Sequence, residues 1–257
     1  MANIDAPIAV FDSGLGGVSV LKEMIKIMPH EDFYYYGDSS NAPYGTKRLE
    51  EVRRLTIAHA EDLIKMGPKG VVIACNTATS AAVRKLREMY PNLPLVGIEP
   101  AVIPAVEKYP HGRILVMATP ITIREEKLHH LIERFGGEAE VIPLACPGLM
   151  DFVEAGNIDS PEVYGFLRDI LEPYKEGLDG VVLGCTHYPF VKKTIVRILG
   201  EDVDIFDGGE GTAKEIKRRM EVAGVLRKDA QKKGRITFAN SDKSQQKEDQ
   251  FWKLLNG

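Results

Sequence analysis

The sequence predicts an α/β fold made of two similar lobes, each with a mostly parallel sheet flanked by helices. Two observations support this prediction. Short apolar runs alternate with longer amphipathic stretches almost throughout the 257 residues, an alternation typical of parallel sheets covered on both faces. Two segments of the first half also recur in the second half at nearly the same offset, which indicates a duplicated α/β unit.

The predicted strands are the short apolar runs. VVIA (71–74) and VVLG (181–184) contain no charged or hydroxyl side chain, as expected for strands buried on both faces of a parallel sheet. In chain order, strands are predicted over residues 8–11, 33–36, 71–74, 95–97, 114–117, 140–143, 181–183, 203–206 and 235–238.

The predicted helices are the amphipathic stretches between these strands. In residues 49–66, Val52, Leu55 and Leu63 follow roughly helical spacing, with Arg, Glu and Lys between them. His59 in this stretch carries no motif, and we expect it to be a surface or helix residue. Helices are predicted over residues 17–28, 49–66, 77–89, 122–135, 161–174 and 211–223.

The internal repeat consists of two pairs of segments. IAVFDSG (8–14) aligns with ILVMATP (114–120), which lies 106 positions further on. VVIACNTATS contains Cys75 and aligns with VVLGCTHYPF, which contains Cys185 110 positions later. The repeat predicts lobe one over residues 1–98 plus 207–257 and lobe two over residues 99–206.

Composition and charge argue against several other classes of protein. The chain is 44% apolar and 27% charged, as is usual for globular proteins, and its net charge of −4 argues against a dedicated nucleic-acid binder. No apolar run approaches the roughly 20 residues that span a bilayer, and the N-terminus lacks the basic region of a secretory signal. Three widely spaced cysteines do not form a disulfide framework. We therefore expect a cytoplasmic protein with reduced thiols.

Cys75 and Cys185 are both expected at the carboxyl ends of strands, the edge at which open α/β sheets bind ligands. Polar residues follow both of them, in CNT and in CTH. A free cysteine is often only a small buried core residue, but two matched positions at this edge favour a function. Each cysteine is also expected to begin a helix, whose N-terminal dipole favours a thiolate.

Two thiols that face each other across a cleft are suited to inverting a stereocentre, because one removes a proton from a carbon and the other delivers one to its far face. A thiol pKa of about 8.5 is within reach of neutral pH. Asp12 could accept a proton or bind an ammonium group, and His187 could tune Cys185 or shuttle a proton. Hydroxyl and amide side chains suited to holding carboxylates are Ser13, Asn76, Thr77, Thr119, Thr122 and Thr186.

Three other interpretations were weighed against this one. DSGLGG resembles a nucleotide-binding turn, but it has neither the GxGxxG spacing nor a P-loop lysine. Zinc binding by Cys75, Cys185, His187 and Cys146 would lack any CxxC or HxxxH pair. A thiol hydrolase with a single Cys–His nucleophile would use Cys185 and His187 and would leave Cys75 without a role.

The motifs as a set resemble the cofactor-independent aspartate/glutamate racemase family, and within it glutamate racemase. The combination of CNTA with GCTHYP is specific, whereas either alone would be only suggestive. The motifs run in family order across roughly the whole chain: VFDSGLGG (10–17), YYGDSSNAPYG (35–45), IACNTA (73–78), IEPA (98–101), ACP (145–147) with the later Glu154, and LGCTHYP (183–189).

The resemblance implies two α/β lobes with pseudo-twofold symmetry and an active site in the cleft between them. Cys75 and Cys185 are implied to be the two catalytic acid/bases, acting on the D- and the L-isomer respectively. Asp12 and His187 are implied to assist them, with Glu154 near His187. The implied substrate-binding residues are Asp12, Ser13, Pro43, Tyr44, Gly45, Asn76, Thr77, Thr119, Thr122 and Thr186.

The activity implied is the interconversion of L- and D-glutamate, with no cofactor and no metal, supplying D-glutamate for peptidoglycan. The resemblance further implies a homodimer. Its ligand is expected to be the small substrate L- or D-glutamate, and neither nucleic acid nor a membrane is expected as a partner. Three alternatives remain at this point: a racemase of another acidic amino acid such as aspartate, the Cys–His hydrolase, and a non-catalytic ligand-binding relative of the fold.

The chain departs from the family pattern at a few positions, none of which removes a catalytic group. Ala118 replaces the glycine of G-T-x-x-T, and Asp151 and Gly208 stand where Pro and Ser are common. Glu125 and Leu128 stand where Ser and Tyr are usual. A carboxylate near the cleft would weaken binding of a dianionic substrate, whereas a solvated carboxylate in the first turn would be stabilised by the helix dipole.

Overall fold

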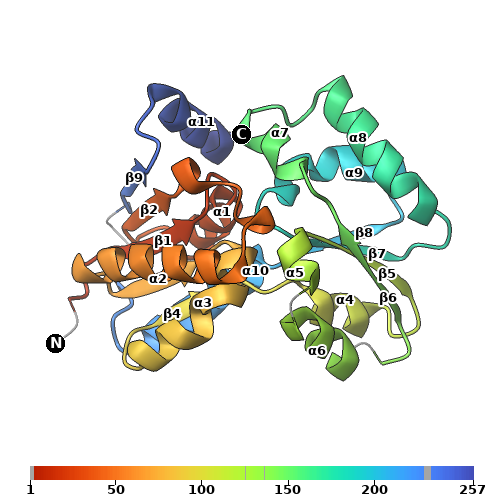
Figure 1. Ribbon diagram of the computed structural model, residues 1–257. Coiled ribbons are helices and arrows are strands. Elements are labelled where there is room, and N and C mark those ends of the chain that lie inside the picture. Colours follow the sequence, from red (N-terminus) through yellow and green to blue (C-terminus); the bar gives the residue numbers. More distant parts are fainter. Residues whose placement is uncertain (1–2, 125, 136, 229–232) are drawn as a thin grey trace.

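The computed structural model describes residues 3–124, 126–135, 137–228 and 233–257. Its strands form two sheets that lie side by side, and every strand pairing is parallel (Figure 1). Sheet 1 contains β1 (Ile8–Asp12), β2 (Phe33–Gly37), β3 (Gly70–Ile73), β4 (Leu95–Gly97) and β9 (Ile236–Asn240), in the order β4-β3-β1-β2-β9. Sheet 2 contains β5 (Arg113–Ala118), β6 (Glu140–Ala145), β7 (Gly180–Gly184) and β8 (Asp204–Asp207), in the order β6-β5-β7-β8. The predicted fold class is confirmed.

The two sheets share one strand order and one register. In sheet 1, β1 lies between β2 and β3 with β4 beyond β3; in sheet 2, β5 lies between β6 and β7 with β8 beyond β7. Ile8 pairs with Gly70 in sheet 1, and the matching Ile114 pairs with Gly180 in sheet 2. The sequence repeat therefore corresponds to two equivalent four-strand units, and β9 extends sheet 1 by pairing with β2.

Helices cover both faces of each sheet (Figure 1). They are α1 (Val18–Ile27), α2 (Leu49–Lys65), α3 (Asn76–Met89), α4 (Val102–Lys108), α5 (Pro120–Arg124), α6 (Glu126–Phe135), α7 (Leu149–Glu154), α8 (Pro161–Leu171), α9 (Lys192–Leu199), α10 (Gly209–Val222) and α11 (Gln245–Asn256). Within the described ranges, none of these helices is long and apolar enough to cross a membrane.

The central strands β1, β3 and β7 are buried on both faces, which explains their continuous apolar runs, whereas the edge strand β6 is partly exposed. In β1, Ile8 and Val10 pack with side chains of α1, α10 and α11. Ala9 and Phe11 point to the opposite face and pack with α2 and α3. Successive strand side chains point to opposite faces, so a strand covered on both sides has no position for an exposed polar residue.

Several predicted helices have different bounds in the structure. The stretch 122–135 comprises α5 and α6, and Glu125 between them lies outside the described residues. The stretch 161–174 ends as an α-helix at Leu171 and continues as a 3₁₀ turn, Glu172–Tyr174. Pro173 explains this change, because proline lacks the N–H and its ring clashes with the carbonyl one turn earlier. The helix predicted at 211 begins at Gly209.

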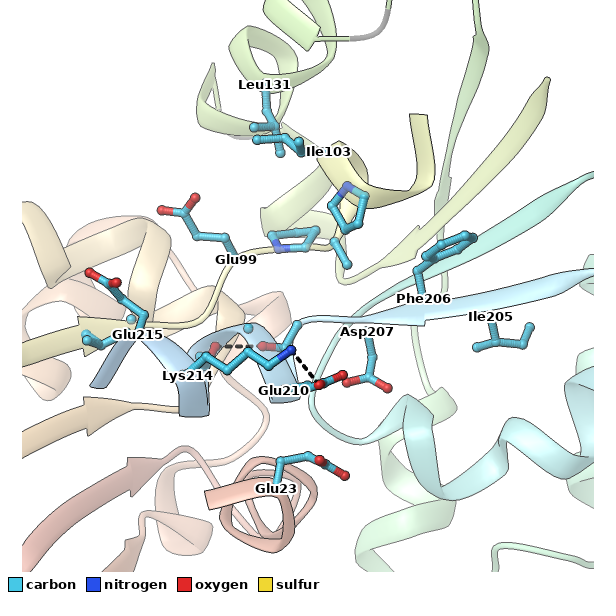
Figure 2. A pocket seen from close by; sticks show the side chains of 18 of the residues that line it. Glu23, Glu99, Ile103, Leu131, Ile205, Phe206, Asp207, Glu210, Lys214 and Glu215 are labelled. Carbon is cyan, nitrogen blue, oxygen red and sulfur yellow. Dashed lines mark hydrogen bonds and ion pairs between the residues drawn. The ribbon is translucent and has the colours of Figure 1, made fainter. Parts of the chain in front are cut away.

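The chain crosses between the sheets twice, after β4 and after β8, and the two crossings touch. A Cβ atom on Gly208 would collide with the backbone oxygen of Glu99 and lie 2.9 Å from Ile98 Cγ1. Glycine at this position, where the family usually has serine, therefore permits close approach of the two crossings. Beside them is a cavity of about 800 Å³, which neither active-site cysteine lines (Figure 2). Its acidic residues include Glu99, Asp207 and Glu210, and Glu210 pairs with Lys214 at 2.7 Å.

Candidate active site

Cys75 follows β3 at the carboxyl edge of sheet 1 and caps the N-terminus of α3, as the sequence predicts. Its sulfur accepts hydrogen bonds from the Ser13 hydroxyl at 3.3 Å and from the Ala78 backbone N–H at 3.5 Å. The residue is only 6% exposed. Burial, reinforced by the negative charge of Asp12, raises the pKa of Cys75 to about 12. In this closed arrangement Cys75 is therefore a thiol that can donate a proton.

Cys185 follows β7 at the corresponding edge of sheet 2, and it is also 6% exposed. The helix expected after it is present, but it starts as a 3₁₀ helix rather than an α-helix. A 3₁₀ turn, Tyr188–Val191, comes first, held by i→i+3 bonds such as Tyr188 N–H to the Cys185 carbonyl at 3.1 Å, and α9 starts only at Lys192. Charge near this sulfur therefore comes from His187 rather than from a helix dipole: His187 Nδ1 lies 3.6 Å from Cys185 Sγ.

His187 and Glu154 form a buried pair beside Cys185. Glu154, at the end of α7, places Oε1 2.8 Å from His187 Nε2. Burial alone lowers the pKa of His187, but its contacts with the Cys185 sulfur and the Glu154 carboxylate outweigh burial and hold that pKa well above 6.5. Burial raises the pKa of Glu154, but the hydrogen bond from His187 and further donors bring it down to about 2. A charged imidazolium therefore faces the Cys185 sulfur, where it favours negative charge.

Asp12 ends β1 and is completely buried between the two sheets. Its carboxylate accepts the Gly14 N–H at 2.9 Å and the Thr186 hydroxyl at 3.1 Å. Burial raises the pKa of Asp12 above 3.8, although the nearby positive charge of His187 opposes the shift. The structure thus brings Asp12 and Thr186 together from opposite sheets. Asp12 lies near Cys75, and Thr186 directly follows Cys185.

Three predicted binding threonines form a chain of hydroxyls across the two lobes. Thr119 Oγ1, after β5, lies 3.0 Å from Thr77 Oγ1 in α3 and 3.0 Å from Thr122 Oγ1 in α5. Asn76 is buried next to them, and within the described part of the chain its side-chain oxygen and nitrogen have no hydrogen-bond partner. These polar groups can hold the carboxylates of a small ligand.

The turn of Pro43, Tyr44 and Gly45 lies against Thr119 of the other lobe, but its tyrosine hydroxyl points elsewhere. Tyr44 OH donates to Asp38 Oδ2 at 2.7 Å, inside the lobe. Gly45 lies against Thr119, since a Cβ on Gly45 would be 2.7 Å from Thr119 Cβ. The turn therefore presents its backbone, rather than the Tyr44 hydroxyl, to the other lobe.

Two further residues around the site went unpredicted. Lys247 in α11 donates to Glu154 Oε2 at 2.6 Å, and nothing in the sequence near either residue indicates this contact across 93 positions. His59 is not a simple surface residue, because its Nε2 lies 3.0 Å from the buried carboxylate of Asp38 and its ring stacks on Phe11 at 5.7 Å. Helical spacing from Val52 and Leu55 could have placed His59 on the buried face of α2.

The described residues contain no group of three or more His, Cys, Asp or Glu side chains placed to hold a metal ion. All three cysteines are free. The third, Cys146, is buried after β6, and its sulfur contacts the Leu144 carbonyl at 3.6 Å. The groups available for chemistry in this cleft are therefore two thiols, carboxylates, an imidazole and hydroxyls.

Comparison with known proteins matches residues 9–216 to the family described as Asp/Glu/Hydantoin racemase. The chain is 51% identical over 238 residues to a glutamate racemase of Clostridium perfringens, covering 92% of this chain and 91% of that one. It is 47% identical over 251 residues to the glutamate racemase of Clostridium acetobutylicum, covering 97% of each.

Solved structures agree with the sequence relatives. The glutamate racemase of Thermus thermophilus in complex with β-chloro-D-alanine matches with a TM-score of 0.82 and 34% identity, over 98% of this chain and 94% of that one. The glutamate racemase of Francisella tularensis in complex with D-glutamate matches with a TM-score of 0.84 and 27% identity, over 99% and 95%. With the family match, the sequence identity and the two-lobe fold in agreement, the chain belongs to the Asp/Glu/hydantoin racemase family.

Proposed function

We propose that the protein interconverts L- and D-glutamate without a cofactor, using Cys75 and Cys185 as acid and base on opposite faces of the α-carbon. The observation that carries this proposal is the equivalence of the two cysteines. Each lies five residues after the glycine that pairs with the first strand of its sheet, Gly70 or Gly180. Two equivalent sheet edges thus carry one thiol each, as a two-base mechanism requires. The glutamate racemase activity of the relatives supports the same substrate.

The electrostatics of the site support a specific starting state for L-glutamate. Cys185, whose sulfur lies 3.6 Å from His187 Nδ1, is the base that removes the α-proton. Cys75, held as a thiol by burial, donates its proton to the other face of the carbon and becomes the thiolate. D-glutamate follows the same path in reverse, with Cys75 as the base. One negative charge is thus shared between two sulfurs, and each turnover moves it from one side to the other.

Substrate carboxylates fit the polar groups at the cleft edge. The buried amide of Asn76 is unpartnered within the described residues, and the hydroxyl chain through Thr119 can reorient its protons toward an anion. Ser13, Thr186 and the backbone of the 43–45 turn complete this set. Asp12 is the carboxylate suited to the substrate ammonium group, and it lies near Cys75.

A circular-dichroism assay with L-glutamate and with D-glutamate tests the activity. The proposal predicts that both solutions lose optical rotation toward the same racemic end point. Constant signal from both enantiomers would refute it. A Cys–His hydrolase would keep its turnover in Cys75→Ser and lose it in Cys185→Ser, whereas a two-base racemase loses turnover in both variants.

The alternative substrate is another acidic amino acid, above all aspartate. The same assay with L- and D-aspartate distinguishes the two substrates. Faster racemisation of aspartate than of glutamate would make aspartate the proposed substrate. Of the departures from the family pattern, Asp151 is exposed in the first turn of α7, away from the threonine hydroxyls. Leu128 is buried in the core between α4 and α6 and lines a small cavity together with Thr122. The effect of Glu125 is left to the assay.

The proposal extends to the cellular setting of the enzyme. D-Glutamate is a constituent of peptidoglycan, so we propose supply of this precursor as the biological role. Three free cysteines suit the reducing cytoplasm. We further propose a homodimer of subunits with lobe one at residues 1–98 plus 207–257 and lobe two at residues 99–206. Sedimentation equilibrium gives the mass of the assembly and would exclude the dimer if it returned 28.5 kDa.

A further inference from the structure

The C-terminal helix α11 reaches the catalytic pair from the lobe opposite to it. α11 packs on α1 and follows β9, so it belongs to sheet 1 (Figure 1). Glu154 ends α7, which packs on sheet 2 with the core around Val153. The contact between Lys247 and Glu154 therefore joins the two lobes.

Lys247 makes two hydrogen bonds to one residue. Its Nζ donates to Glu154 Oε2 at 2.6 Å and to the Glu154 backbone carbonyl at 3.3 Å. The Lys247 side chain is 17% exposed and that of Glu154 11%. Solvent screening is therefore weaker than in exposed pairs such as Lys65 with Asp62, whose side chains are 73% and 71% exposed.

The position of Lys247 is not explained by its own helix. It lies in the first turn of α11, after the cap Ser244, where the positive end of the helix dipole disfavours a lysine. Its favourable partners are instead on α7: the Glu154 carboxylate and a carbonyl at the end of that helix, where the dipole is negative. The contacts of Lys247 therefore stabilise the end of α7 rather than its own helix, α11.

The contact fixes the orientation of the Glu154 carboxylate against the imidazole. Oε1 accepts the Leu15 N–H at 2.6 Å and lies 2.8 Å from His187 Nε2, while Oε2 is occupied by Lys247. A carboxylate held at both oxygens cannot rotate away from the ring. The ring in turn sets its other nitrogen toward the Cys185 sulfur.

We propose that Lys247 is a positioning residue for proton transfer at Cys185, acting through Glu154 and His187 and engaged only when the lobes are closed. It touches neither thiol. This inference rests on the proposed racemase function and deepens it by assigning one side of the reaction to α11. Besides these residues, the charge of Glu154 also acts on Asp12 and Tyr35.

The test uses the primary isotope effect on kcat/KM measured separately with L-[2-²H]- and D-[2-²H]-glutamate. Enantiomers have equal free energy, so kcat/KM must be equal in the two directions and cannot reveal which side is damaged. The isotope effects can, because the C–H bond of L-glutamate breaks toward Cys185 and that of D-glutamate toward Cys75. If only the proton transfer at Cys185 is slowed, that step limits the rate more strongly. The isotope effect from L-[2-²H]-glutamate then rises and that from D-[2-²H]-glutamate falls.

Lys247→Met removes the charge and keeps most of the stem, Lys247→Arg keeps the charge, and Lys253→Met removes an exposed lysine from the same helix. We expect Lys247→Met to lower kcat/KM by about ten- to a hundredfold, with a larger isotope effect from L-glutamate and a smaller one from D-glutamate. Lys247→Arg should restore most of the rate, and Lys253→Met should leave it unchanged.

Unchanged kcat/KM in Lys247→Met, or isotope effects that change equally from both enantiomers, would overturn the positioning role. If Lys247→Met does not fold, Lys247→Gln carries the test, because it also removes the charge and should shift the two isotope effects in the same opposite directions. Absence of glutamate racemisation by the wild-type protein would refute the proposed function itself, which keeps the two failures distinct.

Discussion

The Thr186 hydroxyl of lobe two donates to the Asp12 carboxylate of lobe one at 3.1 Å, although the residues are 174 positions apart. Thr77 and Thr119 make a second contact between the lobes at 3.0 Å. With Cys75 and Cys185 each 6% exposed, this is a closed arrangement in which a substrate is shielded from water. The lobes must separate for glutamate to enter.

Gly16 lies where an added methyl group would collide with the other lobe. A Cβ there would lie 2.5 Å from His187 Nδ1 and from Thr186 Oγ1. We predict that Gly16→Ala lowers kcat/KM by about a hundredfold or more, because a misplacement of about 1 Å in a catalytic site has that effect. Gly165→Ala in α8, where a Cβ meets nothing within 4 Å, is the matched control and should keep full activity. Equal activity of the two variants would show that the lobes do not close as described.

Replacing either catalytic sulfur should stop racemisation. We predict that Cys75→Ser and Cys185→Ser each lower kcat by about 10²–10⁴-fold, the usual contribution of a general acid or base. Cys146→Ser, at a buried cysteine whose sulfur contacts the Leu144 carbonyl, serves as the control and should alter stability more than rate. Steady-state assays from both enantiomers measure this, and full turnover in either active-site variant would exclude a two-base mechanism.

The shifted pKa values of Glu154 and His187 make the free energy of unfolding depend on pH. A carboxyl whose pKa falls from 4.5 to about 2 adds on the order of 3 kcal/mol to the free energy of unfolding above pH 4.5, and this is lost as the pH falls toward 2. The raised pKa of His187 acts in the opposite direction: its stabilisation is complete below pH 6.5 and is lost as the pH rises through the folded-state value.

Urea unfolding of wild type and Glu154→Gln at several pH values measures the contribution of Glu154. The difference in unfolding free energy should be largest near pH 5–6 and should shrink as the pH falls toward 2. Asp62→Asn removes a carboxylate from an exposed ion pair and should show no comparable pH dependence. A pH-independent difference for Glu154→Gln would contradict the assignment of the low pKa.

The carboxylate of Asp38 holds the turn that faces Thr119. Burial raises the pKa of Asp38, but hydrogen bonds from His59, Tyr44 and Asn41 outweigh burial and bring that pKa below 3.8. Tyr44→Phe removes one of these bonds, so we predict a loss of about 1.5–3 kcal/mol in unfolding free energy and a higher KM. Tyr90→Phe, whose hydroxyl makes only a long 3.4 Å contact to Glu61, is the control. Stability and KM equal to wild type in Tyr44→Phe would contradict the role of Asp38.

The fold was predictable because the repeat has a direct physical counterpart. The aligned residues Ile8 and Ile114 occupy the same register position in the two sheets, opposite Gly70 and Gly180. Buried parallel strands leave such regular apolar runs in a sequence. Helix ends were less predictable: the 3₁₀ turn after Cys185 depends on local i→i+3 bonds that apolar periodicity does not report.

The candidate site was predictable where its residues follow strands. Asp12, Cys75 and Cys185 all lie at carboxyl ends of parallel strands, which a strand assignment places at one edge. Glu154 was placed near His187 by family resemblance alone. Lys247 escaped prediction because its contact depends on how α11 packs against the other lobe, which no local pattern encodes.

The central claim is that two sulfurs on opposite faces of one carbon share the proton transfer. The most direct measurement is proton NMR of L-glutamate turned over in deuterated water, stopped early. The account predicts D-glutamate that carries deuterium at the α-carbon from its first appearance, while the remaining L-glutamate still carries mostly protium. D-Glutamate that retains the substrate's own α-hydrogen would contradict it.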